Sequence, residues 1–288
     1  MLVCSESVSY ETDFNLSILV KVLTIAVIGA GVIGSAIAKS LLSMKGERII
    51  ATDRYIEKLR GLEELGITVT RDNKAVREAD IIILCVKPGD VQDVLNEIKD
   101  EIENKLVISV AAAIKLNFLK KTAPKARFIR AMPNIAILVQ EAFIAYCVDS
   151  DVTLENKSKA EEIFRLLGKP LELDEGFMDA ITALSGCAPA YLSVILEALT
   201  YAGLKVGLPR DLALSLSSQA MIGTGKLVLE AQKTPSEIKD MVTTPGGVTI
   251  EGLRELEKIQ IKHAIMKAIE AATMKSRKIT EELSSIKN

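Results

Sequence analysis

The chain has 288 residues, of which 49% are hydrophobic and 26% are charged, and this composition is typical of a soluble globular protein with one large or two ordinary domains. The formal net charge is −2 and no block of Lys and Arg stands out, so nothing indicates nucleic-acid or membrane-surface binding. With one histidine and four scattered cysteines, we expect neither a metal site nor a His-based triad, and we expect a reducing, cytoplasmic location.

The first residues predict a flexible tail. Residues 1–20 carry acidic side chains and no basic region, which is unlike a signal peptide. The apolar stretch that follows is interrupted by Lys21 and by glycines at turn spacing. A buried strand, a turn and a helix therefore explain this stretch better than a membrane span.

Residues 21–175 alternate strand-like and helix-like patterns. Apolar strands that alternate with amphipathic helices are typical of a parallel sheet covered on both faces, so we expect a doubly wound α/β domain of the Rossmann type. The expected strands are Leu23–Ile28, Arg48–Thr52, Ile67–Thr70, Asp80–Pro88, Leu106–Val110, Arg127–Arg130, Phe143–Val148 and Leu171–Leu173. The expected helices are Ile33–Met44, Glu57–Leu65, Val91–Ile102, Lys115–Lys121 and Glu155–Leu167.

Residues 176–288 show helical patterns only, which predicts a second, all-helical domain. The apolar residues of its first two helices do not fit one narrow stripe, and a small bundle cannot bury them all. We therefore expect an oligomer interface here, with a well-packed monomer core as the alternative. The expected helices are Ala188–Leu208, Arg210–Gln232, Pro235–Val242, Val248–Lys258 and one from Ile261 to near the end.

The sequence AVIGAGVIGSAIA places a glycine pattern between the first strand and the first helix. Gly29 would permit the tight turn, Gly31 would let a pyrophosphate approach, and Gly34 would let helix and strand pack closely. The backbone N–H groups of the helix start, at Val32 and Ile33, are donors suited to phosphates. In this context the pattern predicts dinucleotide binding, against a purely structural turn.

Two side chains at the end of the second strand are expected to face the adenosine ribose. Asp53 follows the glycines at the spacing of the acidic residue that bonds ribose hydroxyls, and it would repel a 2′-phosphate. Arg54 has the opposite effect because its guanidinium can pair with that phosphate. We therefore expect the chain to use both NADPH and NADH.

Two further motifs end strands at the carboxyl edge of the sheet, where ligands bind in such folds. Val86, Lys87 and Pro88 end one strand, and they could border the cofactor or form a surface proline turn. Asn134 follows another strand. Its amide could bond a substrate or a nicotinamide, and it could equally hold its own turn.

Two helix starts in the second domain are candidate substrate sites. Ser185 precedes small residues at the first long helix, where a ligand could approach backbone N–H groups, although a simple Ser cap is the alternative. The sequence TTPGGVT places two glycines and three hydroxyls at another helix start. Here the N–H groups around Gly246, Gly247 and Val248 could hold a carboxylate, and Thr244 could add a hydroxyl. A plain helix cap would leave the second glycine without a role.

These motifs, in their order along the chain, resemble those of the pyrroline-5-carboxylate reductase family. The matching blocks are Gly29–Gly34, VKP at Val86–Pro88, MPN at Met132–Asn134, TALSG…PAY at Thr182–Tyr191, GLPR at Gly207–Arg210 and TPGGVTI at Thr244–Ile250. The resemblance spans residues 23–277. It implies a Rossmann domain followed by a helical domain for substrate binding and dimerisation. It also implies reduction of 1-pyrroline-5-carboxylate to proline by NADPH or NADH, in dimers that often assemble into decamers. It also implies that Thr249 is catalytic, with its hydroxyl bonding the ring nitrogen of the cyclic imino acid and relaying a proton from water.

Three places depart from the usual family pattern. Ile135-Ala136 stand where Thr-Pro is frequent, Cys187-Ala188 where Ser-Gly is usual, and Ala111-Ala112-Ala113 where Ala-Ala-Gly is frequent. These departures concern the detail of the cofactor pocket.

Two other functions are compatible with the residues. One is a reductase of another small imine or keto acid on a related scaffold. Such dehydrogenases usually carry a catalytic lysine on the helix that links the domains, and Lys205 is the nearest candidate. The other is a non-catalytic protein that senses dinucleotides.

Overall fold

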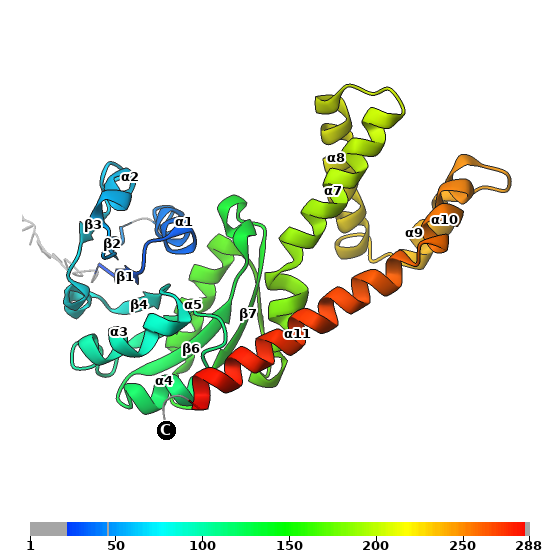
Figure 1. The fold of residues 1–288 in the computed structure, drawn as a ribbon. Helices are drawn as coiled ribbons and strands as arrows, with labels where there is room; N and C mark the ends of the chain where they lie inside the picture. Colours follow the sequence, from blue (N-terminus) through cyan, green and yellow to red (C-terminus); the bar gives the residue numbers. More distant parts are fainter. Residues whose placement is uncertain (1–21, 45, 286–288) are drawn as a thin grey trace, which may run out of the picture.

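The computed structural model describes residues 22–44 and 46–285, and the tail predicted at residues 1–20 lies outside them. An α/β part is followed by a helical part (Figure 1). The strands are β1 (Thr24–Ile28), β2 (Arg48–Thr52), β3 (Thr68–Thr70), β4 (Ile81–Leu84), β5 (Leu106–Ser109), β6 (Arg127–Met132), β7 (Ala142–Val148) and β8 (Gly168–Glu172). They form one sheet in the order β3-β2-β1-β4-β5-β6-β7-β8, so the expected Rossmann-type sheet is confirmed.

Helices cover both faces of this sheet because its central strands are apolar on both sides. The α-helices are α1 (Val32–Leu41), α2 (Arg60–Glu63), α3 (Val91–Ile98), α4 (Leu116–Thr122) and α5 (Leu154–Leu167). The 3-10 turns are η1 (Ile56–Leu59), η2 (Asn73–Glu78), η3 (Pro88–Asp90), η4 (Ile135–Val139) and η5 (Glu175–Phe177). In β1, Ile25 and Val27 pack with residues of α1 and α5, whereas Ala26 and Ile28 pack with residues of α3 and α4.

The sheet departs from the expected parallel arrangement at one edge. β7 runs antiparallel to β6, with Ile129 opposite Val148, and β8 then runs parallel to β7. The physical reason is the connection between β6 and β7, which contains only the short turn η4. A parallel return needs a longer crossover, usually through a helix, so this connection can only lead the chain back in the opposite direction.

The helical part begins with α6 (Met178–Ile181) and a π-helical turn, η6 (Thr182–Gly186). The helices that follow are α7 (Ala188–Lys205), α8 (Arg210–Leu229), α9 (Pro235–Val242), α10 (Val248–Lys258) and α11 (Ile261–Ser285). α7 packs against α8, while α11 runs from α10 back to α6 and η6 (Figure 1). There the hydroxyls of Ser276 and Thr280 donate to one carboxylate oxygen of Asp179 at 2.7 and 3.0 Å, which fixes α11 to α6. We retain the division into domains at residue 175 as a proposal.

The expected exposed apolar surface is present on α7 and α8. Thr200 is the one buried residue in α7 and Ala213 the one in α8. Large apolar side chains lie open, with Val194 at 66% and Leu216 at 53% exposure. By length and composition alone, the helical segments Glu175–Lys205 and Arg210–Leu229 could also cross a membrane. Apolar surface on this scale marks an interaction site.

Candidate active site

The glycine loop between β1 and α1 has the close packing that its sequence predicts. Gly29 has φ +86°, and a Cβ there would lie 2.8 Å from Cγ1 of Val86. A Cβ on Gly34 would lie 2.2 Å from the carbonyl oxygen of Gly29. At Gly31, by contrast, an added Cβ would meet nothing within 4 Å. Two glycines therefore close the turn, and the third leaves open space beside the start of α1.

This helix start has the properties of an anion site. Gly31 is its N-cap and makes no side-chain capping bond, and the first turn holds no acidic residue. The N–H groups of Gly29 and Ala30 donate to the carbonyl oxygen of Thr52 at 2.8 and 3.2 Å, so the loop is tied to the end of β2. The predicted residues Val32 and Ile33 supply the first N–H groups of the helix, which carry its partial positive charge.

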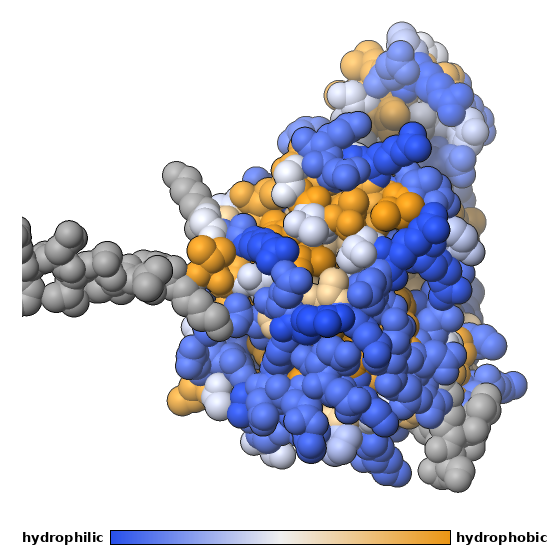
Figure 2. Space-filling view, turned by 90° about the vertical axis from the view of Figure 1, so that its left-hand side faces the viewer, coloured by the Kyte–Doolittle hydropathy of each residue, from blue (hydrophilic) through white to orange (hydrophobic). Residues whose placement is uncertain are grey.

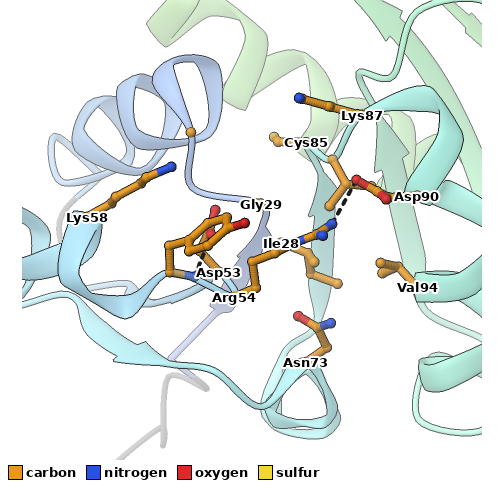
Figure 3. Close-up of a pocket in the computed structure, with 13 residues that line it drawn as sticks. Ile28, Gly29, Asp53, Arg54, Lys58, Asn73, Cys85, Lys87, Asp90 and Val94 are labelled. Carbon is orange, nitrogen blue, oxygen red and sulfur yellow. Dashed lines mark hydrogen bonds and ion pairs between the residues drawn. The ribbon is translucent and has the colours of Figure 1, made fainter.

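A pocket of about 310 Å³ opens beside this loop, within the size range of small-molecule sites (Figure 3). Six of the predicted cofactor residues line it: Gly29, Gly31, Asp53, Arg54, Val86 and Lys87. Pro88 begins η3 just beyond them. β4 ends at Leu84, so this group follows the last paired residue at the carboxyl edge, as expected.

Sequence reasoning missed seven residues that also line the pocket: Ile28, Tyr55, Lys58, Asn73, Cys85, Asp90 and Val94. The carboxyl-edge argument that selected Val86–Pro88 could have found Asp90, which lies two residues after Pro88. Asn73 carries no such signal, because it reaches the pocket from η2. It accepts a hydrogen bond from the Thr52 hydroxyl at 2.7 Å and donates to Glu97 at 2.9 Å.

Charged side chains border the outer end of the pocket. The Asp53 carboxylate accepts a hydrogen bond from the backbone N–H of Tyr55 at 2.9 Å. The Arg54 guanidinium pairs with Asp90 at 2.8 Å. The ammonium of Lys58 lies 4.4 Å from the centre of the Tyr55 ring. A carboxylate and cations therefore lie together at this part of the pocket.

Cys85 lines the same pocket. Burial raises the pKa of its thiol far above the usual range. A raised pKa keeps the thiol in its neutral form at physiological pH, which is the less nucleophilic form.

The structure also brings together two predicted residues from the two domains. The Asn134 side chain accepts from the N–H of Ala136 at 2.9 Å, so it does hold its own turn. The same amide donates to the carbonyl oxygen of Ser185 at 3.0 Å. Asn134 thus connects the end of β6 to η6, directly before α7. Neither residue lines the glycine-loop pocket.

The TTPGGVT segment forms the tight start of α10. Gly246 has φ +69°, and a Cβ on Gly247 would lie 2.3 Å from the hydroxyl oxygen of Thr244. Both glycines therefore have a structural role, and the premise that a plain cap would leave the second one without a role is wrong. Gly247 is the N-cap of α10 and makes no side-chain capping bond, so the N–H groups that follow stay available. Val248 is 90% exposed.

Within one chain, the structure does not bring Thr249 to the pocket. Figure 1 places α9 and α10 on the opposite side of the molecule from β1 to β4. α10 packs against α11. The two candidate half-sites, the glycine-loop pocket and the start of α10, therefore lie apart in a single chain.

One departure from the family pattern has a visible backbone consequence. Ala113, which stands where glycine is frequent, has φ +62° in the left-handed region. Alanine is strained in this conformation because its Cβ approaches the following carbonyl oxygen. The other two departures lie at the N-cap of α7, Cys187, and at the start of η4, Ile135.

Two family models match the chain. Residues 175–279 match the model described as pyrroline-5-carboxylate reductase dimerisation. Residues 24–113 match the model described as NADP oxidoreductase, coenzyme F420-dependent. The first covers the helical part and the second covers the glycine loop and the pocket.

Known relatives cover nearly the whole chain. The pyrroline-5-carboxylate reductase of Pisum sativum is 38% identical over 262 residues, which are 89% of this chain and 96% of that protein. The enzyme of the same name from Methanosarcina acetivorans is 39% identical over 88% of this chain and 97% of its own length. A crystal structure of the Plasmodium falciparum pyrroline carboxylate reductase with NADP bound superposes with a TM-score of 0.82. It is 31% identical and covers 90% of this chain and 98% of its own.

Proposed function

Because the chain belongs to the pyrroline-5-carboxylate reductase family, we propose that it reduces 1-pyrroline-5-carboxylate to L-proline with NADPH or NADH, the last step of proline biosynthesis. The observation that carries this function is the presence, in one chain, of the glycine-loop pocket and the TPGGVTI helix start. A protonated cyclic imine is already electrophilic, so the protein needs no nucleophile. It must align the ring, bind one carboxylate and manage one proton.

The pocket fits a dinucleotide. The open space at Gly31 leaves room for a pyrophosphate, and the N–H groups of Val32 and Ile33 supply donors to it. Asp53 and Arg54 border the place where the adenosine ribose would lie. When bound there, the nicotinamide cofactor supplies the hydride.

At the inner end of the site, we assign Val86, Lys87 and Pro88 to the cofactor wall, because they follow β4 at the carboxyl edge. We also assign Asn134 to the cofactor site, beside the pocket lining, because it holds its own turn and the Ser185 carbonyl together. Ser185 then lies beside the substrate position, between the two domains.

The start of α10 supplies the substrate half of the site in this proposal. The N–H groups around Gly246, Gly247 and Val248 bind the carboxylate, and the Thr244 hydroxyl adds a further donor. Thr249 bonds the ring nitrogen and relays a proton. A threonine hydroxyl is a weak acid on its own, so the proton comes from water through this hydroxyl.

A second copy of the chain completes the site. The two half-sites lie on opposite sides of one chain, and the chemistry requires them to meet (Figure 1). The apolar surface of α7 and α8 provides the means, because exposed surface of this kind is buried when symmetric oligomers form. Hydrophobic residues are also exposed on the face of the α/β part shown in Figure 2. Independently of that view, Val32 and Val139 of the α/β part are 64% and 70% exposed.

The dimer, or a decamer assembled from such dimers, is therefore the proposed working unit, with no nucleic acid or membrane partner. We assign it to the cytoplasm. Within residues 22–44 and 46–285, Cys85, Cys147 and Cys187 are free thiols, as a reducing compartment favours.

One assay tests the function and both alternatives. The purified chain is mixed with NADPH and with pyrroline-5-carboxylate, other cyclic imines or keto acids, and cofactor oxidation is followed. We expect turnover with pyrroline-5-carboxylate to exceed turnover with every other compound. Preference for a keto acid would favour a related dehydrogenase, and cofactor binding without turnover would favour a sensor. Failure of the folded chain to complement a proline-requiring strain would count against the proposal.

A further inference from the structure

An ion pair crosses the outer end of the pocket. The Arg54 guanidinium lies 2.8 Å from the Asp90 carboxylate. Arg54 follows β2 and Asp90 ends η3, so the pair joins the two walls between which a dinucleotide would lie. In Figure 3 the Arg54 side chain reaches across the pocket to Asp90, with Gly29 above this bridge and Asn73 below it.

The Arg54–Asp90 ion pair orients the guanidinium, but it is exposed to solvent and can be displaced by another anion. The side chains of Arg54 and Asp90 are 63% and 38% exposed, so water and salt screen their attraction. A phosphate carries more charge than a carboxylate and accepts bidentate bonds from a guanidinium, so it can compete for the same group. A ligand without this phosphate leaves the pair intact.

We propose, building on the dinucleotide function above, that Asp90 is a positioning residue that limits the preference of this chain for NADPH. By holding the guanidinium of Arg54, Asp90 competes with the 2′-phosphate of NADPH. NADH, which has a ribose hydroxyl at this place, meets no such competition. Asp90 thus acts through Arg54, in the same direction as the carboxylate of Asp53.

The test measures binding of two cofactor fragments by calorimetry, without the imine. The probes are 2′,5′-ADP, which carries the 2′-phosphate, and 5′-AMP, which lacks it. We expect Asp90→Asn to raise the affinity ratio of 2′,5′-ADP to 5′-AMP by about 2- to 5-fold, the scale of an exposed ion pair. In turnover, the KM for NADPH should fall by a larger factor than kcat changes.

Two controls separate this mechanism from simple repulsion. Asp93→Asn removes an equal charge from an exposed position in the first turn of α3, outside the pocket lining, and should leave the ratio at the wild-type value. Arg54→Met keeps the aliphatic stem and removes the guanidinium. In that background, Asp90→Asn should have no further effect on the ratio.

Three results would overturn the inference. The ratio in Asp90→Asn could stay at the wild-type value, it could change as much in the Arg54→Met background, or Asp93→Asn could change it equally. These results leave the dinucleotide function untouched. Failure of the wild-type chain to bind either fragment would overturn the dinucleotide function as well.

Discussion

Arg130 donates to Glu175 at 2.9 Å where β6 meets the first turn after the sheet. The Arg130 side chain is 4% exposed and that of Glu175 is 28% exposed, and the N–H of Leu116 donates to the same carboxylate oxygen at 2.8 Å. This carboxylate therefore joins β6, the start of α4 and the segment that leads into the helical part.

We expect Glu175→Ala to lower the free energy of unfolding by about 2–4 kcal/mol, because it leaves a buried guanidinium without its partner. Glu175→Gln keeps the oxygen acceptor and should cost less. Urea unfolding measures both changes. The double variant Arg130→Met/Glu175→Leu is the control, because it removes both charges and should recover much of the loss. A double variant as unstable as the sum of the single ones would show that the pair itself is not the cause.

Thr249→Ala should lower kcat by about 10²- to 10⁴-fold if the hydroxyl takes part in proton transfer. Cofactor affinity should stay near that of the wild type, because the proposed cofactor contacts come from the lining of the glycine-loop pocket and none of them comes from α10. Thr249→Ser keeps the hydroxyl and should retain much more activity. Steady-state kinetics and fluorescence titration of NADPH give the two quantities. An unchanged kcat in Thr249→Ala would leave this residue with no catalytic role.

Asp53→Asn should shift the ratio of kcat/KM toward NADPH by roughly 1–3 kcal/mol, the scale of charge-assisted hydrogen bonds. The substitution removes the charge that repels a 2′-phosphate, and it keeps the oxygen that accepts from the N–H of Tyr55. The local turn should therefore survive. Kinetics with both cofactors measure the ratio, and added salt should reduce the shift. A ratio that does not move would mean that the end of β2 does not read the ribose.

The wild-type chain should sediment as a dimer or a larger oligomer at micromolar concentration. Val194→Asp places a charge on the exposed apolar surface of α7 and should weaken association by about 2 kcal/mol or more, because an unpaired charge would be buried there. Leu154→Asp is the matched control. Leu154 is 85% exposed at the start of α5, in the α/β part, and its substitution should leave the oligomer intact. A wild-type monomer would refute the proposed working unit.

Ala113→Gly should be less costly to stability than Ala112→Gly by about 1–2 kcal/mol, the strain of a Cβ in the left-handed region. Both variants gain the same conformational freedom when unfolded. Only Ala113 has a positive φ, so only its substitution relieves strain. Thermal unfolding compares them. Equal losses would mean that the φ of Ala113 stores no strain.

The sequence predicts those features that depend on neighbouring residues. α9 and α10 have their predicted bounds, Pro235–Val242 and Val248–Lys258, because a capping box at Thr234 and two glycines set the helix starts locally. The close packing at Gly29 and Gly34 is likewise predictable, because it follows from the turn itself.

Other features depend on distant parts of the chain and could not be predicted. The pairing of Arg54 with Asp90 joins residues that are 36 positions apart. The antiparallel direction of β7 has a local cause instead, the short connection after β6, but its prediction requires the exact ends of both strands, and the sequence pattern ended β6 at Arg130 rather than Met132. The separation of Thr249 from the pocket depends on how all the helices of the helical part are arranged.

That separation also determines how genetic damage in this protein combines. If each site takes its glycine loop from one chain and its α10 from the other, a chain defective in the loop and a chain defective at Thr249 can form a mixed dimer. One active site of that dimer then contains both defects, and the other active site contains neither. Two alleles that are each inactive alone would then support growth together, whereas two alleles damaged in the same half would not.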